Sequence, residues 1–139
     1  MINNTYSDFS VNFEKNNFIN DLSKVIDRTS IRQSIANILL TMKGEKPFNR
    51  NFGCDVYKQL FENSSNGINS LELIKLQRNI GNQIGFYEPR VVLTNINFDE
   101  SQIDSNILKI SLSYIVRNMD ENVGQSGEDS VSVTISKVR

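Results

Sequence analysis

The sequence contains no histidine among its 139 residues, and Cys54 is its single cysteine. The absence of histidine excludes a His-based triad, a His general base and a His-ligated metal. One cysteine excludes an internal disulfide and a multi-cysteine zinc site. Because no base lies near Cys54 in the sequence, we expect a small buried residue rather than a nucleophile. We predict no enzyme, no catalytic residues, no metal and no cofactor.

An excess of charge of either sign is also missing. Lys and Arg number 15 against 16 Asp and Glu, a net charge of -1, so no global field favours nucleic acid or an anionic membrane. Lys43, Lys46 and Arg50 cluster, but no aromatic stripe for base stacking accompanies them. No stretch approaches the roughly 18 apolar residues of a membrane helix, and the N-terminus lacks the pattern of a signal peptide. We expect neither a nucleic-acid partner nor a membrane partner.

The length of 139 residues and the 38% hydrophobic content are typical of one domain with a modest core. We predict a single domain over residues 1–139, with residues 1–20 as a less regular N-terminal arm. In the arm, Phe9, Val11 and Phe13 alternate with polar residues, which predicts a short half-buried strand. Residues 22–26 are its expected hairpin partner.

Helical spacing begins at Asp27. It predicts a helix with Asp27 or Thr29 as N-cap and Gly44 as the left-handed residue after its end. Its expected core face consists of Ile31, Ile35, Ile38, Leu39 and Met42.

A second, longer helix is predicted to open with the capping pair Asn69 and Glu72, and Gly81 and Gly85 weaken its last turns. Its predicted apolar face is Leu73, Leu76, Ile80 and Ile84, and its predicted solvent face is Lys75, Arg78, Asn79 and Asn82.

Between the two helices, two glycines and a proline predict a shaped loop. We expect Phe48 and Phe52 to anchor it to the core, so that truncating either ring to Ala costs roughly 3–5 kcal/mol. A short helix capped by Asp55 should follow and carry Val56, Leu60 and Phe61. The structural loop residues are Gly44, Glu45, Pro47, Phe48, Phe52 and Gly53.

The last third of the chain changes to a period of two, which predicts three antiparallel strands. The predicted inward faces are, in order, Val92, Thr94, Ile96 and Phe98; Leu108, Ile110, Leu112, Tyr114 and Val116; and Val131, Val133 and Ile135. We therefore predict an α+β fold in which amphipathic helices pack on one face of a small antiparallel β-meander.

The segment Glu88-Pro89-Arg90 joins the longer helix to the meander. Pro89 stiffens the turn and forces Glu88 into an extended conformation. Two interpretations remain open: an internal ion pair that orients the turn, which the residues alone favour, and a rigid charged contact for another chain. Glu45 and Glu88 could also be imagined as the two carboxylates of a glycosidase, but the sequence gives no separation between them.

Three segments together resemble a known family. They are residues 31–48, residues 52–62 with Phe52-Gly53, Val56-Tyr57 and Leu60-Phe61-Glu62, and Tyr87-Glu88-Pro89-Arg90-Val91. The sequence resembles the small baseplate wedge proteins, or sheath initiators, of contractile-tailed phages, whose relatives include a type VI secretion baseplate component. The similarity extends over about residues 20–137. Lys46 stands where the family usually has Arg, and Arg50 where Pro is common.

The resemblance implies a structural role. Family members lie in the inner baseplate, contact the wedge core and template the first ring of sheath subunits. For this chain it implies wedge-core binding by Glu88, Pro89 and Arg90, with wedge core proteins and the tail sheath protein as partners. Multiple copies in a six-fold virion baseplate, assembled in the host cytoplasm, are also implied. An old tail-lysozyme label makes a carboxylate-dependent muramidase the alternative.

The last predicted strand has the features of an open sheet edge. Between Ser130 and Lys137 it alternates small hydroxyls with Val131, Val133 and Ile135, and has no Pro and no inward charge before Lys137. Monomeric proteins usually blunt such edges. We predict that the sheath is recruited by strand addition here; the competing interpretation is that this strand is central or merely pairs within its own chain, since strand order is not readable from sequence.

Overall fold

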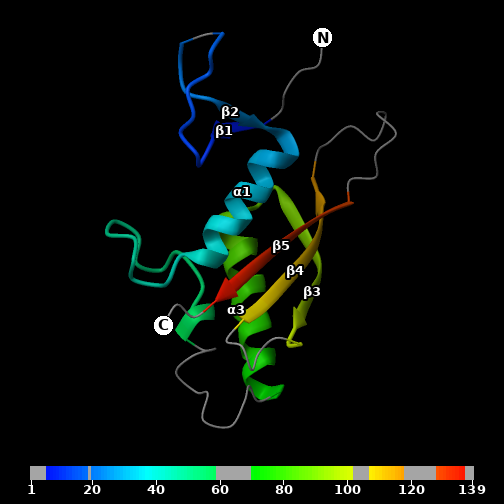
Figure 1. Ribbon diagram of the computed structural model, residues 1–139. Coiled ribbons are helices and arrows are strands. Elements are labelled where there is room, and N and C mark those ends of the chain that lie inside the picture. The colour runs from blue at the N-terminus through cyan, green and yellow to red at the C-terminus, as the bar shows by residue number, and fades with distance from the viewer. Residues whose placement is uncertain (1–5, 19, 59–69, 102–106, 118–127, 137–139) are drawn as a thin grey trace.

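The computed structural model describes residues 6–18, 20–58, 70–101, 107–117 and 128–136 (Figure 1). The described elements, in chain order, are β1 (Ser7–Phe9), β2 (Lys24–Ile26), α1 (Asp27–Leu40), α3 (Ser70–Tyr87), β3 (Val91–Asp99), β4 (Ile107–Val116) and β5 (Glu128–Ser136). This order, with helices before a meander, confirms the predicted α+β class. Among these elements, no helix is long and apolar enough to cross a bilayer.

The meander is an antiparallel sheet with strand order β3-β4-β5. Figure 1 shows α1 and α3 side by side against this sheet. α1 contacts β5 and α3 contacts β3, and the two helices contact each other. The helices therefore cover one face of the sheet, as predicted.

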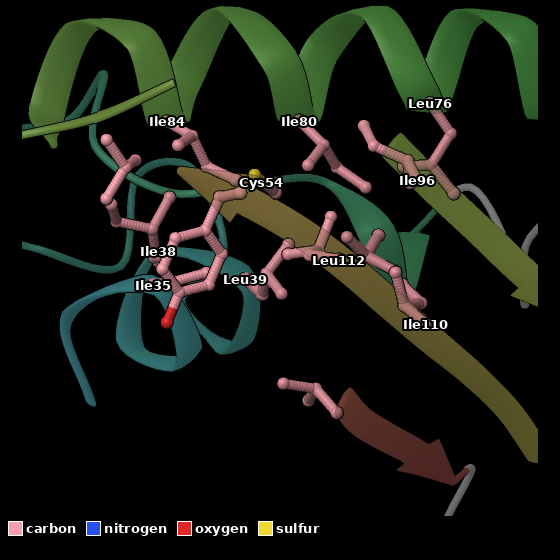
Figure 2. Close-up of a cluster of buried hydrophobic side chains, with 14 of the residues drawn as sticks. Ile35, Ile38, Leu39, Cys54, Leu76, Ile80, Ile84, Ile96, Ile110 and Leu112 are labelled. Carbon is pink, nitrogen blue, oxygen red and sulfur yellow. The ribbon is translucent and has the colours of Figure 1, made fainter. Parts of the chain in front are cut away.

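The core lies between the helices and the central strand (Figure 2). All five inward residues predicted for β4 are buried, from Leu108 to Val116. From α3, Leu76, Ile80 and Ile84 point toward them, and α1 contributes Ile31, Ile35, Ile38 and Leu39. The alternation along β4 and the helical spacing on α1 and α3 both predicted this core.

A bulge in β3 makes one predicted face wrong. The pairing with β4 shifts between Leu93 and Asn95, so an extra residue, Thr94, enters β3 there and reverses which face the side chains take. Val92 is therefore exposed, whereas Ile96 is buried and Phe98 packs partly against the core.

The ends of α1 differ from the prediction. α1 ends at Leu40 because Thr41 is extended and its carbonyl oxygen accepts a hydrogen bond from Cys54 N at 2.9 Å. Gly44 has φ +88° but lies beyond the helix, and Met42 is exposed. At the other end the N-cap is Ile26, with no side-chain cap. Asp27 instead bonds to Tyr6, with Asp27 N 2.8 Å from Tyr6 O.

The predicted N-terminal hairpin is present, but its first strand is shorter. β1 pairs with β2 from Ser7 opposite Ile26 to Phe9 opposite Lys24. Val11 and Phe13 lie beyond β1, where Phe13 adopts a positive φ of 50°. All three apolar residues of the predicted strand are more than half exposed, so its half-buried face was wrong.

The connection between the helices is described only in part. Val56 is buried and lies in a helical segment at residues 56–58. The predicted positions Leu60 and Phe61, and the predicted cap Asn69, lie outside the described residues.

Gly81→Ala and Gly85→Ala should each raise the free energy of unfolding by about 0.5–1 kcal/mol, because Ala is the better helix former. A Cβ at either position meets no atom within 4 Å. Urea unfolding of the two variants measures the effect; a loss of stability in both would show that α3 needs these glycines.

Candidate functional site

The Glu88-Pro89-Arg90 turn is held by backbone hydrogen bonds on both sides. Glu88 N donates to Ile84 O at 2.8 Å, which continues the hydrogen bonding of α3, and Arg117 N donates to Arg90 O at 2.7 Å. The turn thereby connects the end of α3 to the start of β3 and to the end of β4.

The Glu88 side chain is buried, at 1% exposure, and forms a two-pronged ion pair with Nε and Nη2 of Arg90. Burial alone raises the pKa of Glu88, but hydrogen bonds and the charge of Arg90, with a contribution from Ser34, outweigh it, so the pKa lies below its usual range. The Arg90 guanidinium also lies over the Tyr6 ring, 5.0 Å from its centroid. The internal ion pair considered for this turn is therefore present.

The loop at residues 42–53 is built from successive turns. Glu45 closes the first one, because its Oε2 accepts from Met42 N at 2.9 Å. Gly44 N donates to Arg50 O at 2.9 Å, and Asn49 N donates to Lys46 O at 3.2 Å. The turn from Lys46 to Asn49 has Pro47 and Phe48 as its central residues, and a further turn follows, in which Phe52 N donates to Asn49 O at 3.1 Å.

The predicted anchoring of this loop is right for one aromatic ring and wrong for the other. Phe52 packs partly against the core and meets the Tyr87 ring edge-on, with centroids 4.9 Å apart. Phe48 is fully exposed, at 101%, because its place in the turn directs it away from the core. Phe48→Ala should therefore leave stability unchanged, contrary to the expectation from the sequence.

One stripe of α3 holds the loop at three positions spaced by four residues, which share a helix face. Asn79 accepts from Lys43 Nζ at 3.0 Å, and Tyr87 Oη donates to Asn49 Oδ1 at 3.2 Å. Between them, the Gln83 amide nitrogen, in the orientation that donates, is 3.1 Å from Asn51 O. Asn79, predicted on the solvent face, is partly buried and also holds the loop through this exposed hydrogen bond.

β5 is an edge strand among the described residues, since it pairs with β4 alone. Val133 and Ile135 are buried and Val131 is half-buried, while the hydroxyl face is mostly exposed. In the part of the chain that the structure describes, β5 is therefore not a central strand; strand addition and pairing within the chain alone remain the two interpretations. Of the predicted site residues, the structure brings the loop and the Glu88 turn together through Tyr87, whereas β5 lies at the opposite sheet edge from β3.

Sequence reasoning missed a charged cluster at the start of β5. Asp129 is buried and accepts hydrogen bonds from Arg32, with Nε at 2.9 Å, and from Tyr114 Oη at 3.1 Å. Burial alone raises the pKa of Asp129, but Arg32, the Ser130 amide and Tyr114 lower it below its usual range. The position of Asp129, two residues before Val131, was a signal that its carboxylate lies inward, although it does not identify Arg32 as the partner.

Cys54 is buried, and burial raises the pKa of its thiol to about 12. The thiolate is therefore disfavoured at neutral pH. Among the described residues, no group of three or more Cys, Asp or Glu side chains is placed to hold a metal ion.

Acid should destabilise the fold. Since the pKa values of Glu88 and Asp129 are lowered on folding, both carboxylates contribute stability above their unfolded pKa of about 4 and lose it as pH falls through the folded pKa. Urea unfolding at pH 7 and pH 3 measures the difference, and Asp129→Asn should reduce it. Equal stability at the two pH values would contradict the assignment of these pairs.

The fold of the chain is shared by small α+β proteins whose structures have been solved. It superimposes on a chain of the anti-feeding prophage baseplate (TM-score 0.67, 16% identity, 84% of this chain and 90% of that one). It also superimposes on a putative tail lysozyme from Geobacter sulfurreducens (TM-score 0.63, 21% identity, 80% of this chain and 91% of that one). At these identities the likeness shows the fold alone.

Sequence comparison gives the family. The chain belongs to the baseplate wedge protein gp25 family, whose model matches residues 26–121. It is 36% identical to baseplate wedge protein gp25 of Enterobacteria phage T4 over 96 residues, and these residues make up 69% of each chain. The resemblance carried by the three sequence segments is thereby confirmed.

Proposed function

We propose that this chain is a structural, non-catalytic component of a contractile-tail baseplate wedge, which binds the wedge core and initiates sheath assembly. Membership of the baseplate wedge protein family is the observation that carries the proposal. We further propose that residues 1–139 act as one domain, present in multiple copies in a six-fold virion baseplate assembled in the host cytoplasm.

For the wedge core, we propose a contact through Pro89 and Arg90, with Glu88 as a positioning residue. Glu88 is buried, so it is not available to a partner directly. The two-pronged ion pair with Glu88 fixes the Arg90 guanidinium. The Arg90 side chain is 29% exposed, and the neighbouring Pro89 is exposed as well. A guanidinium fixed in this way is preorganised for a partner, because its rotamer entropy is already lost.

For the sheath, we propose strand addition to the outer edge of β5. An edge strand presents unpaired amides and carbonyls that recruit another chain. β5 spans nine residues, with no proline in Glu128–Ser136. Its hydrophobic residues are turned inward, so a docking strand would gain main-chain hydrogen bonds without displacing the core.

Proline at β5 should block sheath polymerisation on otherwise complete baseplates. Backbone amides along an edge strand point alternately to the neighbouring strand and outward. Of the two single variants Val133→Pro and Thr134→Pro, one therefore loses an amide that bonds to β4 and the other loses an amide that points outward. The variant that loses the outward donor should remain folded by circular dichroism yet form no sheath, as counted by electron microscopy. Thr94→Pro is the matched control, because it lies at the bulge of the opposite edge strand.

Normal sheath growth on baseplates that carry the folded variant without the outward donor would contradict strand addition. Loss of sheath in the Thr94→Pro control as well would indicate a general defect of the sheet rather than a role of the β5 edge.

The muramidase alternative has less support. A catalytic acid of a glycosidase needs a raised pKa and access to the substrate, whereas Glu88 is buried, paired with Arg90 and has a lowered pKa. The Glu45 carboxylate closes a turn of its own loop. A cell-wall lysis assay of the purified chain and of its Glu88→Gln variant tests this alternative. Lysis by the unaltered chain, together with no lysis by the variant, would favour the enzyme.

A further inference from the structure

Phe48 is a fully exposed aromatic side chain in a well-held loop. The same loop carries the exposed side chains of Lys43, Lys46 and Arg50. Ring contacts link the loop to the end of α3: Phe52 meets Tyr87, and Tyr87 meets Phe86, each with centroids 4.9 Å apart. Phe86 is itself 77% exposed. We call the exposed residues Lys43, Lys46, Phe48, Arg50 and Phe86 the Phe48 surface.

The loop that carries Phe48 is ordered by its own contacts. Backbone turns hold it from within, and Asn79, Gln83 and Tyr87 hold it to α3. Little conformational entropy is left for the loop to lose on binding. Exposed aromatic and Arg side chains on rigid supports are typical binding hot spots. A core role for Phe48 is excluded by its exposure.

The charge of this surface indicates what it binds. Residues 42–55 carry three basic side chains, Lys43, Lys46 and Arg50, and two acidic ones, Glu45 and Asp55, of which Asp55 pairs with Lys43 (Oδ2 to Nζ, 4.0 Å). The Glu45 carboxylate is already bonded to Met42 N. The loop is therefore positive, although the chain as a whole has a net charge of -1. A negatively charged partner would be attracted to this face in particular.

We propose that the Phe48 surface binds an acidic segment of another baseplate wedge protein, with an apolar side chain of that segment packed against Phe48. This inference rests on the proposed wedge binding and deepens it, because it adds a second contact surface and the chemistry of the partner.

Single-stranded nucleic acid fits this surface less well. Such binding needs successive free ring faces for base stacking, and Lys46 Nζ already lies over the Phe52 ring, 4.4 Å from its centroid. Tyr87 meets that same ring edge-on. Phe48 and Phe86 alone leave no continuous stack, whereas an acidic protein segment needs just one apolar contact and the cations of Lys46 and Arg50.

The test measures the affinity of the labelled chain for baseplate wedges that were assembled without it. Phe48→Ala should weaken binding roughly 30-fold or more, the effect of losing an interface hot spot. The double variant Lys46→Glu/Arg50→Glu should weaken it about tenfold or more and reduce its salt dependence. A photo-cross-linking amino acid at position 48 should then attach to a segment rich in Asp and Glu.

The controls remove equivalent groups elsewhere. Phe18 is 97% exposed, so Phe18→Ala controls for the loss of an exposed ring. The double variant Lys15→Glu/Lys24→Glu controls for charge reversal. Both control variants should bind the wedges as tightly as the unaltered chain does. Equal binding by Phe48→Ala and the unaltered chain would overturn this inference alone. No binding by the unaltered chain would overturn wedge binding as well. Cross-links to nucleic acid, or to a segment without net negative charge, would contradict the proposed partner.

Discussion

Arg90→Ala should lower the free energy of unfolding by about 3 kcal/mol or more. The change removes the partner of the Glu88 carboxylate, which is buried at 1% exposure. An uncompensated buried charge typically costs about 3–5 kcal/mol. The loss also removes the guanidinium that lies over the Tyr6 ring. Urea unfolding near pH 7, where the carboxylate is charged, measures the effect.

The double variant Glu88→Gln/Arg90→Ala is the matched control, because it removes the charge of Glu88 together with its partner. It should recover part of the stability that Arg90→Ala loses. A loss below about 1 kcal/mol in Arg90→Ala would indicate a weak, surface-like pair and contradict the burial of Glu88. Burial of the pair therefore predicts a large effect on stability in addition to any effect on wedge assembly.

Gly53→Ala should destabilise the fold by about 3 kcal/mol or more. Gly53 has φ +103°, a conformation that costs other residues about 1–3 kcal/mol. An added Cβ would also lie 2.3 Å from the carbonyl oxygen of Thr41. That oxygen accepts the hydrogen bond from Cys54 N, so relieving the overlap must disturb the end of α1.

Gly44→Ala separates the two causes. Gly44 also has a positive φ, of 88°, but a Cβ there meets no atom within 4 Å. The Gly44→Ala variant should therefore show the conformational cost alone. Its free energy of unfolding, measured by heat or urea, should be clearly higher than that of Gly53→Ala. Similar small losses in both variants would show that the backbone of Thr41 can move away without cost.

The elements with strict periodicity could be predicted from the sequence. β4 is central and alternates without interruption, so all its inward residues were identified. β3 was predicted less well, because a bulge is a property of strand pairing and the extra residue, Thr94, carries no local signal. The end of α1 was missed for a similar reason: the hydrogen bond that Thr41 accepts comes from Cys54, thirteen residues further on.

The candidate site was predictable where its residues act locally. Pro89 and its flanking charges indicated a stiff turn, and the ion pair within it was one of the two interpretations considered. Phe48 was misassigned because an aromatic residue in a loop reads as an anchor, and its exposure depends on the turn that places it. The contact of Asp129 with Arg32 joins residues 97 positions apart, and no local pattern specifies such a pair.

A reconstruction of the assembled tail, at a resolution that separates strands, tests the central claim most directly. Our account predicts a strand of the first sheath ring beside the outer edge of β5, with N–O distances of about 2.7–3.2 Å to its main chain. A first sheath ring that contacts β3 or the helices instead, with the edge of β5 left unpaired, would contradict it.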